Sequence, residues 1–293
     1  MLQHAFRSMG TDVELLLDVG DVESAAAAFA DAEHEFGRIE GRFSRFRADS
    51  ELSQLNRSGT APVSAEMLSL LETALDARQR TGGRFDPTVH DALAASGYDR
   101  SFEQIDAAGQ DAEPAARPAA CNGNVTIDRA AGTVALAADV RIDLGGIAKG
   151  YAADRVAGRL ARTGPCLVNA GGDIAVAGRP HGGAWNVGVP TGDGEITLAL
   201  VSGGLATSGR DRRWWSRAGE HRHHLIDPYT GRPSTSDLMR VTVVGGSAVD
   251  AEILAKYLFL MGSEAAARTA DRDRLPALLV TEDGATHYAG GLA

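Results

Sequence analysis

The chain has 293 residues, of which 44% are hydrophobic, so it can form one large domain or two small ones with a real core. Its formal net charge of -10 argues against a general nucleic-acid binder, because such proteins need a basic face to displace counterions. A local site for a small anion stays compatible with an acidic protein. The two cysteines, Cys121 and Cys166, show no C-x-x-C spacing, which argues against a disulfide framework and a thiolate zinc site.

The N-terminal residues contain no long apolar run and no cleavage signal. No segment of the sequence is typical of a transmembrane span. The sequence therefore predicts a cytoplasmic protein without a membrane partner.

In the first half of the chain, apolar spacing predicts a strand at 12–19 and an Ala-rich helix at 21–41. The segment Asp49-Ser50-Glu51-Leu52 resembles a helix N-cap with acidic first-turn residues. A second amphipathic helix is predicted at 64–81, capped by Ser64 and ended by a glycine pair. Residues 99–123 are polar and rich in Ala, Asp and Pro, which predicts a surface loop or a connection between lobes.

The second half mixes hairpins with strand–helix units. The predicted elements are strands at 124–128 and 133–137, a helix at 147–162, a strand–turn–strand at 166–174, strands at 185–189, 195–201 and 241–244, a helix at 247–261 and a strand at 277–281. This alternation predicts an α+β (mixed α/β) fold. No G-x-G-x-x-G follows the first strand, which disfavours a Rossmann domain.

The segment 141–154, RIDLGGIAKGYAAD, is the most informative part of the sequence. Gly145 and Gly146 carry no Cβ, so another backbone or a ligand can approach them closely. Lys149 follows where a helix begins, and a helix N-terminus favours an anion. Two interpretations stay open on these residues alone: a phosphate-bearing ligand held at the turn, or a tight turn with a solvated lysine.

Three further segments carry groups suited to ligand binding or catalysis. Asp86 and Thr88 flank a proline, an arrangement that binds a ligand's polar edge or forms only an Asx turn. The side chains of segment 203–209 are small and include two hydroxyls. This composition is typical of a segment that approaches a ligand closely and equally of an ordinary tight loop. His224 and Asp227 place an imidazole near a carboxylate, a pair that can position a proton acceptor or can be merely a surface His and a turn Asp.

Seven motifs occur in order along the chain: MGT at 9–11, FSRF and the SEL and LN that follow it at 43–56, GRFDPT at 83–88, DLGGIAKGY at 143–151, NAGGDI at 169–174, ATSG at 206–209 and HLIDPYTG at 224–231. These motifs in this order carry a resemblance to one known family, the FAD:protein FMN transferases (ApbE-type flavin transferases). The resemblance extends from about residue 5 to about residue 290. It implies a single domain of this family over 1–293, with mixed sheets, flanking helices and a flavin cleft between two lobes.

The resemblance implies that the protein cleaves FAD and joins the FMN half, through its phosphate, to a Thr or Ser hydroxyl of an acceptor flavoprotein. AMP leaves and Mg²⁺ assists. The catalytic set implied is His224, Lys149 and Asp227, with His224 acting on the attacking hydroxyl. The FAD-binding set is Met9, Phe46, Asp86, Thr88, Gly145, Gly146, Lys149, Thr207 and Ser208. Phe46 stands where many relatives carry a tyrosine, and its ring keeps an aromatic face for stacking.

The sequence departs from the family pattern at the metal site. The family binds its metal with an Asp, a Thr and the backbone carbonyl of the Ala at the position of Ala148. Alignment on the LFxxG ending at 258–262 puts Glu252 at the Asp position and Lys256 at the Thr position. Glutamate can still ligate Mg²⁺, but a protonated lysine has no lone pair to offer.

Several interpretations of Glu252 and Lys256 follow. As an i, i+4 pair they also match an ordinary ion pair on a helix surface. If they lie in the site, the protein is a transferase that holds its metal differently, or one in which the Lys256 ammonium replaces the metal. The other interpretations are a FAD-binding homologue without transfer activity and a FAD pyrophosphatase that uses water as the acceptor.

Overall fold

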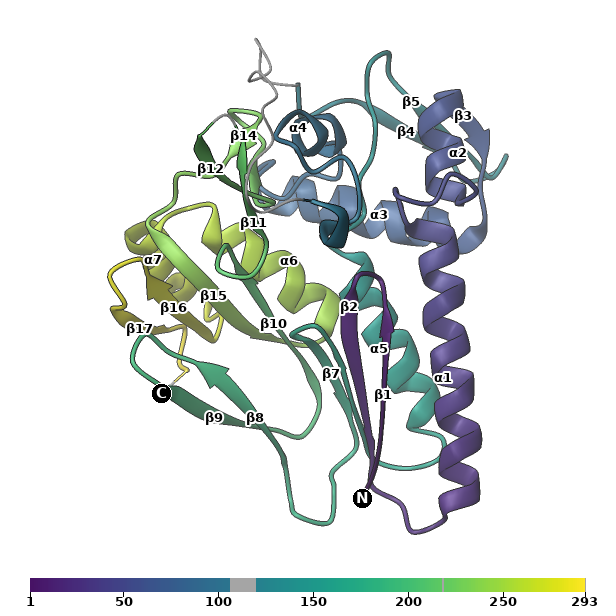
Figure 1. Ribbon diagram of the computed structural model, residues 1–293, viewed down its shortest axis with the longest axis vertical. Helices are drawn as coiled ribbons and strands as arrows, with labels where there is room; N and C mark the ends of the chain where they lie inside the picture. Colours follow the sequence, from purple (N-terminus) through teal and green to yellow (C-terminus); the bar gives the residue numbers. More distant parts are fainter. Residues whose placement is uncertain (106–119, 218, 293) are drawn as a thin grey trace. The chain divides into compact units, whose positions relative to one another are not determined.

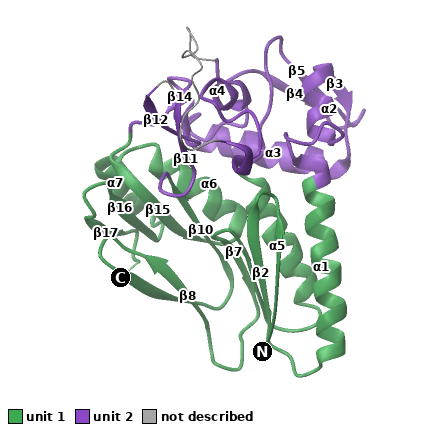
Figure 2. Ribbon diagram, viewed as in Figure 1, with its two compact units in different colours: residues 1–40, 147–209, 236–293 green, residues 41–146, 210–235 purple. Residues whose placement is uncertain are grey.

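The computed structural model describes residues 1–105, 120–217 and 219–292. The chain divides into two compact units, each built from separate stretches of sequence (Figure 2). Unit 1 comprises residues 1–40, 147–209 and 236–293, and unit 2 comprises residues 41–146 and 210–235. Across the described residues, no helix is long and apolar enough to cross a membrane.

An eight-stranded sheet forms the centre of unit 1, and every neighbouring pair of strands in it is antiparallel (Figure 1). In spatial order its strands are β1 (Leu2–Ser8), β2 (Thr11–Leu17), β6 (Cys166–Ala170), β7 (Asp173–Ala177), β10 (Gly203–Gly209), β15 (Leu238–Gly245), β16 (Ala277–Thr281) and β17 (Thr286–Ala289). The order combines strands from all three stretches of unit 1, so the sheet joins segments that are far apart in sequence.

The two faces of this sheet have different partners. Helices α5 (Ala148–Leu160) and α6 (Ala248–Phe259) pack on one face, against β7, β10 and their neighbours. The hairpin of β8 (Trp185–Pro190) and β9 (Glu195–Leu200) shares an apolar core with the other face, through Leu205 and Trp185 among others. Since successive side chains on a strand point to opposite faces, β10 divides its residues between these two environments.

Two further helices belong wholly or mainly to unit 1. Helix α1 (Val22–Phe43) begins in unit 1 and its last three residues belong to unit 2. Helix α7 (Ser263–Asp273) packs against β16 and β17. Both are rich in alanine, the best helix former.

Unit 2 combines short helices with small sheets. Its helices are α2 (Glu51–Ser58), α3 (Ala65–Arg80), α4 (His90–Ala95) and the 3₁₀ turn η1 (Phe102–Gln104). Its strands form the sheets β3 (Thr60–Pro62)–β5 (Thr133–Leu136)–β4 (Val125–Asp128), β11 (Trp214–Arg217)–β12 (Glu220–His223) and β13 (Ile226–Asp227)–β14 (Arg232–Pro233). Trp215, Tyr98 and Leu93 form a buried cluster that joins α4 to the β11–β12 hairpin.

The predicted α+β (mixed α/β) combination of helices and strands is confirmed. Ser50 caps α2 and Ser64 caps α3, each by accepting a backbone N–H three residues on. The predicted loop at 99–123 lies mostly outside the described residues, which omit 106–119; its described part contains η1.

Candidate functional site

Four ionisable side chains meet on the helix-covered face of the sheet in unit 1. Lys149, in the first turn of α5, donates to Asp173 at the start of β7 and to Glu252 of α6. The second contact joins Lys149 Nζ to Glu252 Oε1 at 3.0 Å, and Lys256 Nζ lies 3.2 Å from the same oxygen. We call Lys149, Asp173, Glu252 and Lys256 the ion cluster.

The ion cluster is largely removed from water. The side chain of Glu252 is 1% exposed and that of Lys256 is 17% exposed, so they are not an ordinary surface pair. Burial alone would raise the pKa of Glu252, but the two neighbouring ammonium groups outweigh it and hold this carboxylate ionised. Burial, together with the Glu252 charge, raises the pKa of Asp173 in spite of its contact with Lys149. The cluster thus contains one firmly ionised carboxylate between two lysines.

Close packing of α5 on α6 makes this geometry possible. A Cβ on Gly150 would lie 2.8 Å from the carbonyl oxygen of Ala248, so only glycine fits there. The bare backbone at Gly150 also donates its N–H to Glu252 Oε2 at 3.0 Å. Asp154, one turn further along α5, accepts the N–H groups of Ala248 and Val249 at 2.8 and 3.0 Å and fixes the start of α6.

The ion cluster does not fit a divalent metal ion. Both oxygens of Glu252 are already used, one by the two lysines and the other by a backbone N–H. A cation at this carboxylate would stand beside two like charges, and the ammonium of Lys256 cannot ligate it. Within the described ranges, no group of three or more His, Cys, Asp or Glu side chains is arranged to hold a metal.

Met9 lies in the tight turn between β1 and β2. Met9 and Gly10 have φ angles of 53° and 65°, the pattern of a two-residue hairpin turn in which both central residues are left-handed. Such a φ is uncommon for a side chain other than glycine, so the turn holds Met9 in a strained backbone conformation. The next residue, Thr11, packs on Gly171 of the β6–β7 turn, where a Cβ would come within 2.0 Å of its hydroxyl.

Thr207 and Ser208 are consecutive on β10 and therefore face opposite ways. Gly204 approaches the backbone of α6, so Ser208, four residues on, shares the face of the ion cluster. Thr207 shares the opposite face with Leu205 and contacts the hydroxyl of Thr242 at 2.8 Å. The two hydroxyls cannot both contact one ligand from the same side of the sheet.

In unit 2, Asp86 and Thr88 form a buried turn. Asp86 accepts both the N–H and the hydroxyl of Thr88, each at 2.9 Å. Thr88 in turn accepts the N–H of Gly123 at 3.0 Å, and Asp86 accepts that of Asn122. The side chains of Asp86 and Thr88 thus fix the conformation of the backbone around them. A cavity of about 480 Å³ lies nearby and is lined in part by Gly83 and Asn122.

Phe46 presents an exposed aromatic face, with 41% of its surface accessible. Its ring lies 5.6 Å from that of Tyr98, and the guanidinium of Arg45 stands 4.2 Å from its centre. Arg45 also pairs with Asp143 at 2.7 Å, and Asp143 accepts the N–H of Gly145 at 2.8 Å. The glycine turn and the aromatic residue predicted from the sequence therefore belong to one network in unit 2.

His224 follows the last strand residue of β12, and Asp227 ends β13. The Asp227 carboxylate accepts the N–H of Tyr229 at 2.9 Å, which is an Asx turn. His223 is buried: its Nε2 donates to the Ser234 carbonyl at 3.0 Å, and its Nδ1 accepts the N–H of Leu225 at 3.2 Å. These two bonds assign the proton to Nε2. Burial lowers the pKa of His223 to about 4, so it is neutral and anchors the backbone on both sides of His224.

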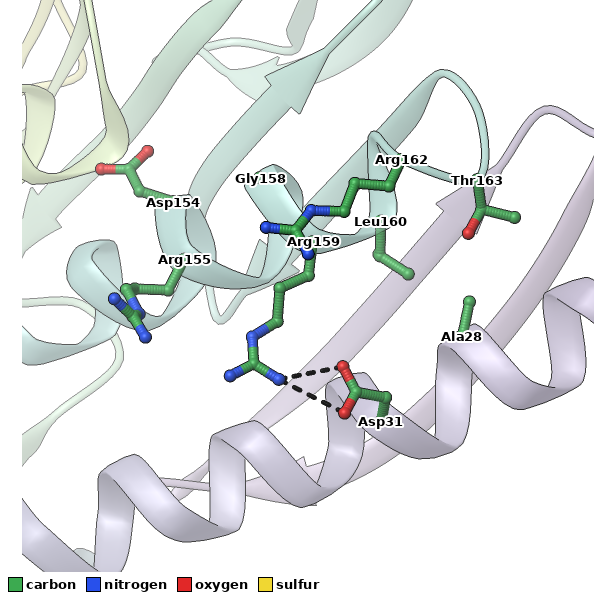
Figure 3. A pocket seen from close by; sticks show the side chains of 9 residues that line it. All are labelled: Ala28, Asp31, Asp154, Arg155, Gly158, Arg159, Leu160, Arg162 and Thr163. Atoms are coloured by element: carbon green, nitrogen blue, oxygen red, sulfur yellow. Dashed lines mark hydrogen bonds and ion pairs between the residues drawn. The ribbon is translucent and has the colours of Figure 1, made fainter.

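A larger cavity, of about 680 Å³, lies between α1 and α5 and contains none of the predicted site residues (Figure 3). Its lining residues are Ala28, Asp31, Asp154, Arg155, Gly158, Arg159, Leu160, Arg162 and Thr163. Arg159 contacts both oxygens of Asp31 at 3.0 and 3.3 Å, as the dashed lines show. Arg155 and Arg159 also contact the buried Glu35. The cavity is a gap between helices bridged by compensated ion pairs.

Sequence reasoning missed several residues that hold the site together. Asp173 pairs with Lys149 across 24 positions, and the only local signal was a carboxylate directly after a Gly-Gly turn. Asp154 caps α6 from another helix, and Arg45 holds the glycine turn through Asp143. The sequence motif pointed to His224, and no role was predicted for the adjacent His223. Each of these roles depends on tertiary contacts.

Comparison with known proteins agrees with this architecture. The ApbE family model matches residues 9–279. A FAD:protein FMN transferase of Treponema pallidum is 34% identical over 242 residues, covering 74% of this chain and 67% of that protein. Its counterpart in Vibrio cholerae is 31% identical, covering 86% of this chain and 79% of that protein.

Solved structures of similar proteins have the same fold. The ApbE protein of Thermotoga maritima superposes with a TM-score of 0.87 at 28% identity, over 98% of this chain and 96% of that one. The flavin transferase ApbE of Vibrio cholerae gives a TM-score of 0.80 at 26% identity, over 98% and 96% of the two chains. With the family model spanning nearly all of its length, the chain belongs to the ApbE family.

Proposed function

We propose that the protein is a FAD:protein FMN transferase. The observation that carries the proposal is the match to the ApbE family over residues 9–279, together with relatives of that name that are about a third identical. The ion cluster supports it, because phosphoryl transfer needs charge neutralisation more than covalent help from the protein.

The reaction joins an acceptor hydroxyl to the FMN-side phosphorus of FAD. The hydroxyl oxygen forms a new P–O bond, and the bond from that phosphorus to the bridging oxygen of the diphosphate breaks. AMP leaves with the bridging oxygen and its electron pair. The hydroxyl proton passes to a base, so the products are AMP and a protein carrying FMN in phosphodiester linkage.

Each residue of the proposed site has a role that suits the chemistry of its side chain. Lys149 places its ammonium at the start of α5, where it offsets negative charge on the diphosphate. Phe46 offers its exposed ring for stacking on a planar ring of FAD. His224 takes the proton of the attacking hydroxyl, and the Asp227 turn orients the segment that follows it. Because the ion cluster does not fit Mg²⁺, no step is assigned to a metal.

Asp86 and Thr88 act as positioning residues for the FAD site through the turn that they fix. Met9, Gly145, Gly146 and Ser208 complete the FAD-binding set, whereas Thr207 faces the other side of β10 and supports that strand through the hydroxyl of Thr242. The acceptor is a flavoprotein that offers a Thr or Ser hydroxyl. The cytoplasmic location expected from the sequence stays a prediction.

The test is a transfer assay with purified protein, FAD and an acceptor domain that carries a single target threonine. We expect a fluorescent acceptor whose mass rises by one FMN less one water, with one AMP released per acceptor labelled. A Thr→Ala acceptor is the control and should stay unlabelled. Release of AMP and free FMN without acceptor would instead indicate a pyrophosphatase, and tight FAD binding without AMP release would indicate a binding protein; either result would refute the proposal.

A further inference from the structure

Lysine is used at only two positions in this chain. Of its 29 basic Lys and Arg residues, all are arginine except Lys149 and Lys256. Both lysines belong to the ion cluster and both approach the same oxygen of Glu252, at 3.0 and 3.2 Å. A compact ammonium is therefore found only where two positive charges converge on one buried carboxylate. An ammonium is a point charge with rotatable donors, unlike the planar fork of arginine.

Lys256 is held in place by an ion pair, and its side chain stays partly exposed. Its side chain is 17% exposed, and the buried Glu252 carboxylate fixes its ammonium at the end of α6. An ammonium has three N–H donors, and the hydrogen bonds that the described part of the chain shows for Lys256 use one of them. The others are available to an anionic oxygen.

The ion cluster supplies positive charge through its ammonium groups, but it does not offer the oxygen ligands that a metal cation needs. Glu252 supplies the carboxylate that a divalent ion would need, but both its oxygens are engaged by N–H donors. The position that would complete a coordination shell carries the positive charge itself. A protein-held ammonium thus stands where an exchangeable cation would otherwise be bound.

We infer that the ammonium of Lys256, held by Glu252, replaces a divalent cation at the diphosphate of FAD, so that this protein binds FAD and transfers FMN without a metal. The inference rests on the proposed function. In the transferase, Lys256 donates to a non-bridging oxygen of the diphosphate and offsets the charge that develops as AMP leaves. No bond to Lys256 forms or breaks.

The first experiment compares the wild-type protein with chelator and with added Mg²⁺. We expect the FAD dissociation constant, measured by calorimetry, and the transfer rate to agree within about twofold between the two conditions. Transfer that stops with chelator and returns with Mg²⁺ would overturn the inference while leaving the proposed function intact. An absence of transfer in both conditions would instead refute the proposed function.

The second experiment removes the charge. Lys256→Met should weaken FAD binding about 10- to 100-fold in chelator, the range expected for one hydrogen bond to a charged group, and Mg²⁺ should not restore it. Lys256→Arg keeps the charge and should retain most of the affinity. Arg268→Met, on the exposed face of α7, is the matched control and should leave affinity unchanged. Full FAD affinity in a folded Lys256→Met protein would contradict the inference.

The third experiment exploits the scarcity of lysine. Lysine labelled with ¹³C at Cε gives two NMR signals, which the Lys256→Arg variant assigns. Addition of FAD in chelator should shift the Lys256 signal, and Mg²⁺ should then change nothing. In the double variant Glu252→Asp/Lys256→Thr, we expect FAD binding to become at least tenfold tighter with Mg²⁺. An unmoved Lys256 signal at saturating FAD, or a folded double variant indifferent to Mg²⁺, would count against the inference.

Discussion

The pair of Glu252 and Lys256 should be energetically coupled far more strongly than an exposed helical pair. The perturbations are Glu252→Gln and Lys256→Met, made singly and together. If the two side chains act as a buried ion pair, the double variant should lose less stability than the sum of the single losses. An i, i+4 pair on an exposed helix face would show only about 0.3–0.5 kcal/mol of coupling.

The structure sets the expected magnitude. The two charged atoms lie 3.2 Å apart, with side chains 1% and 17% exposed. At an effective dielectric constant of about 20, the gross attraction is about 5 kcal/mol. Desolvation and the competing contact from Lys149 offset part of it. A net coupling of about 1.5–3 kcal/mol remains, as for other hydrogen bonds to charged groups.

The assay is urea unfolding of the four proteins, followed by circular dichroism, in low salt and in about 1 M salt, where the screening length falls to about 3 Å. The matched control is the same cycle on the exposed i, i+4 pair Glu264 and Arg268 of α7. A coupling below about 0.5 kcal/mol for Glu252 and Lys256, or one that disappears in high salt as the control should, would refute the reasoning.

Two further predictions concern packing and pH. The Gly150→Ala variant should lose about 1–3 kcal/mol of stability, because its Cβ would lie 2.8 Å from the backbone of Ala248. Gly158, in the same helix, has open space around it, so Gly158→Ala should gain about 0.5–1 kcal/mol. Equal changes in the melting temperatures of the two variants would contradict this packing. His223 has a pKa of about 4 in the fold and 6.5 as a free side chain, so the unfolded chain binds its proton first and stability falls as pH drops below 6.5. Between pH 7.5 and pH 5 the loss from this group should be about 2 kcal/mol in urea titrations, and a folded His223→Gln variant with the same pH slope as wild type would show that His223 is not its source.

Local chemistry made some elements predictable and tertiary packing decided the rest. The capping serines Ser50 and Ser64 identify their helices from sequence, because a side-chain oxygen satisfies a backbone N–H only three residues away. Strand β1 was missed: its side chains alternate between half-buried and exposed at the edge of the sheet, which leaves no clear apolar pattern. Helix α7 was missed because alanine and charged residues give it little apolar contrast.

The same division holds in the site. The i, i+4 spacing correctly placed Glu252 and Lys256 on one helix face, and the glycine pair correctly preceded a helix that begins near Lys149. The partners of Lys149 could not be predicted from the sequence, because Asp173 and Glu252 lie next to it only through the packing of α5 and α6 on the sheet. The roles of the predicted FAD-binding and catalytic residues stay predictions.

The discontinuous make-up of the two units has a consequence for synthesis on the ribosome. Leu15 of β2 pairs with Val168 of β6. The inner edge of the first hairpin therefore has no partner strand until 153 more residues have been synthesised. Unit 2 likewise needs residues 210–235, and β10 needs β15. Loop closure over such lengths is slow, and an uncovered apolar strand edge invites wrong pairing. The nascent chain should therefore depend on chaperones until most of its length has emerged, and neither unit is available as one uninterrupted fragment.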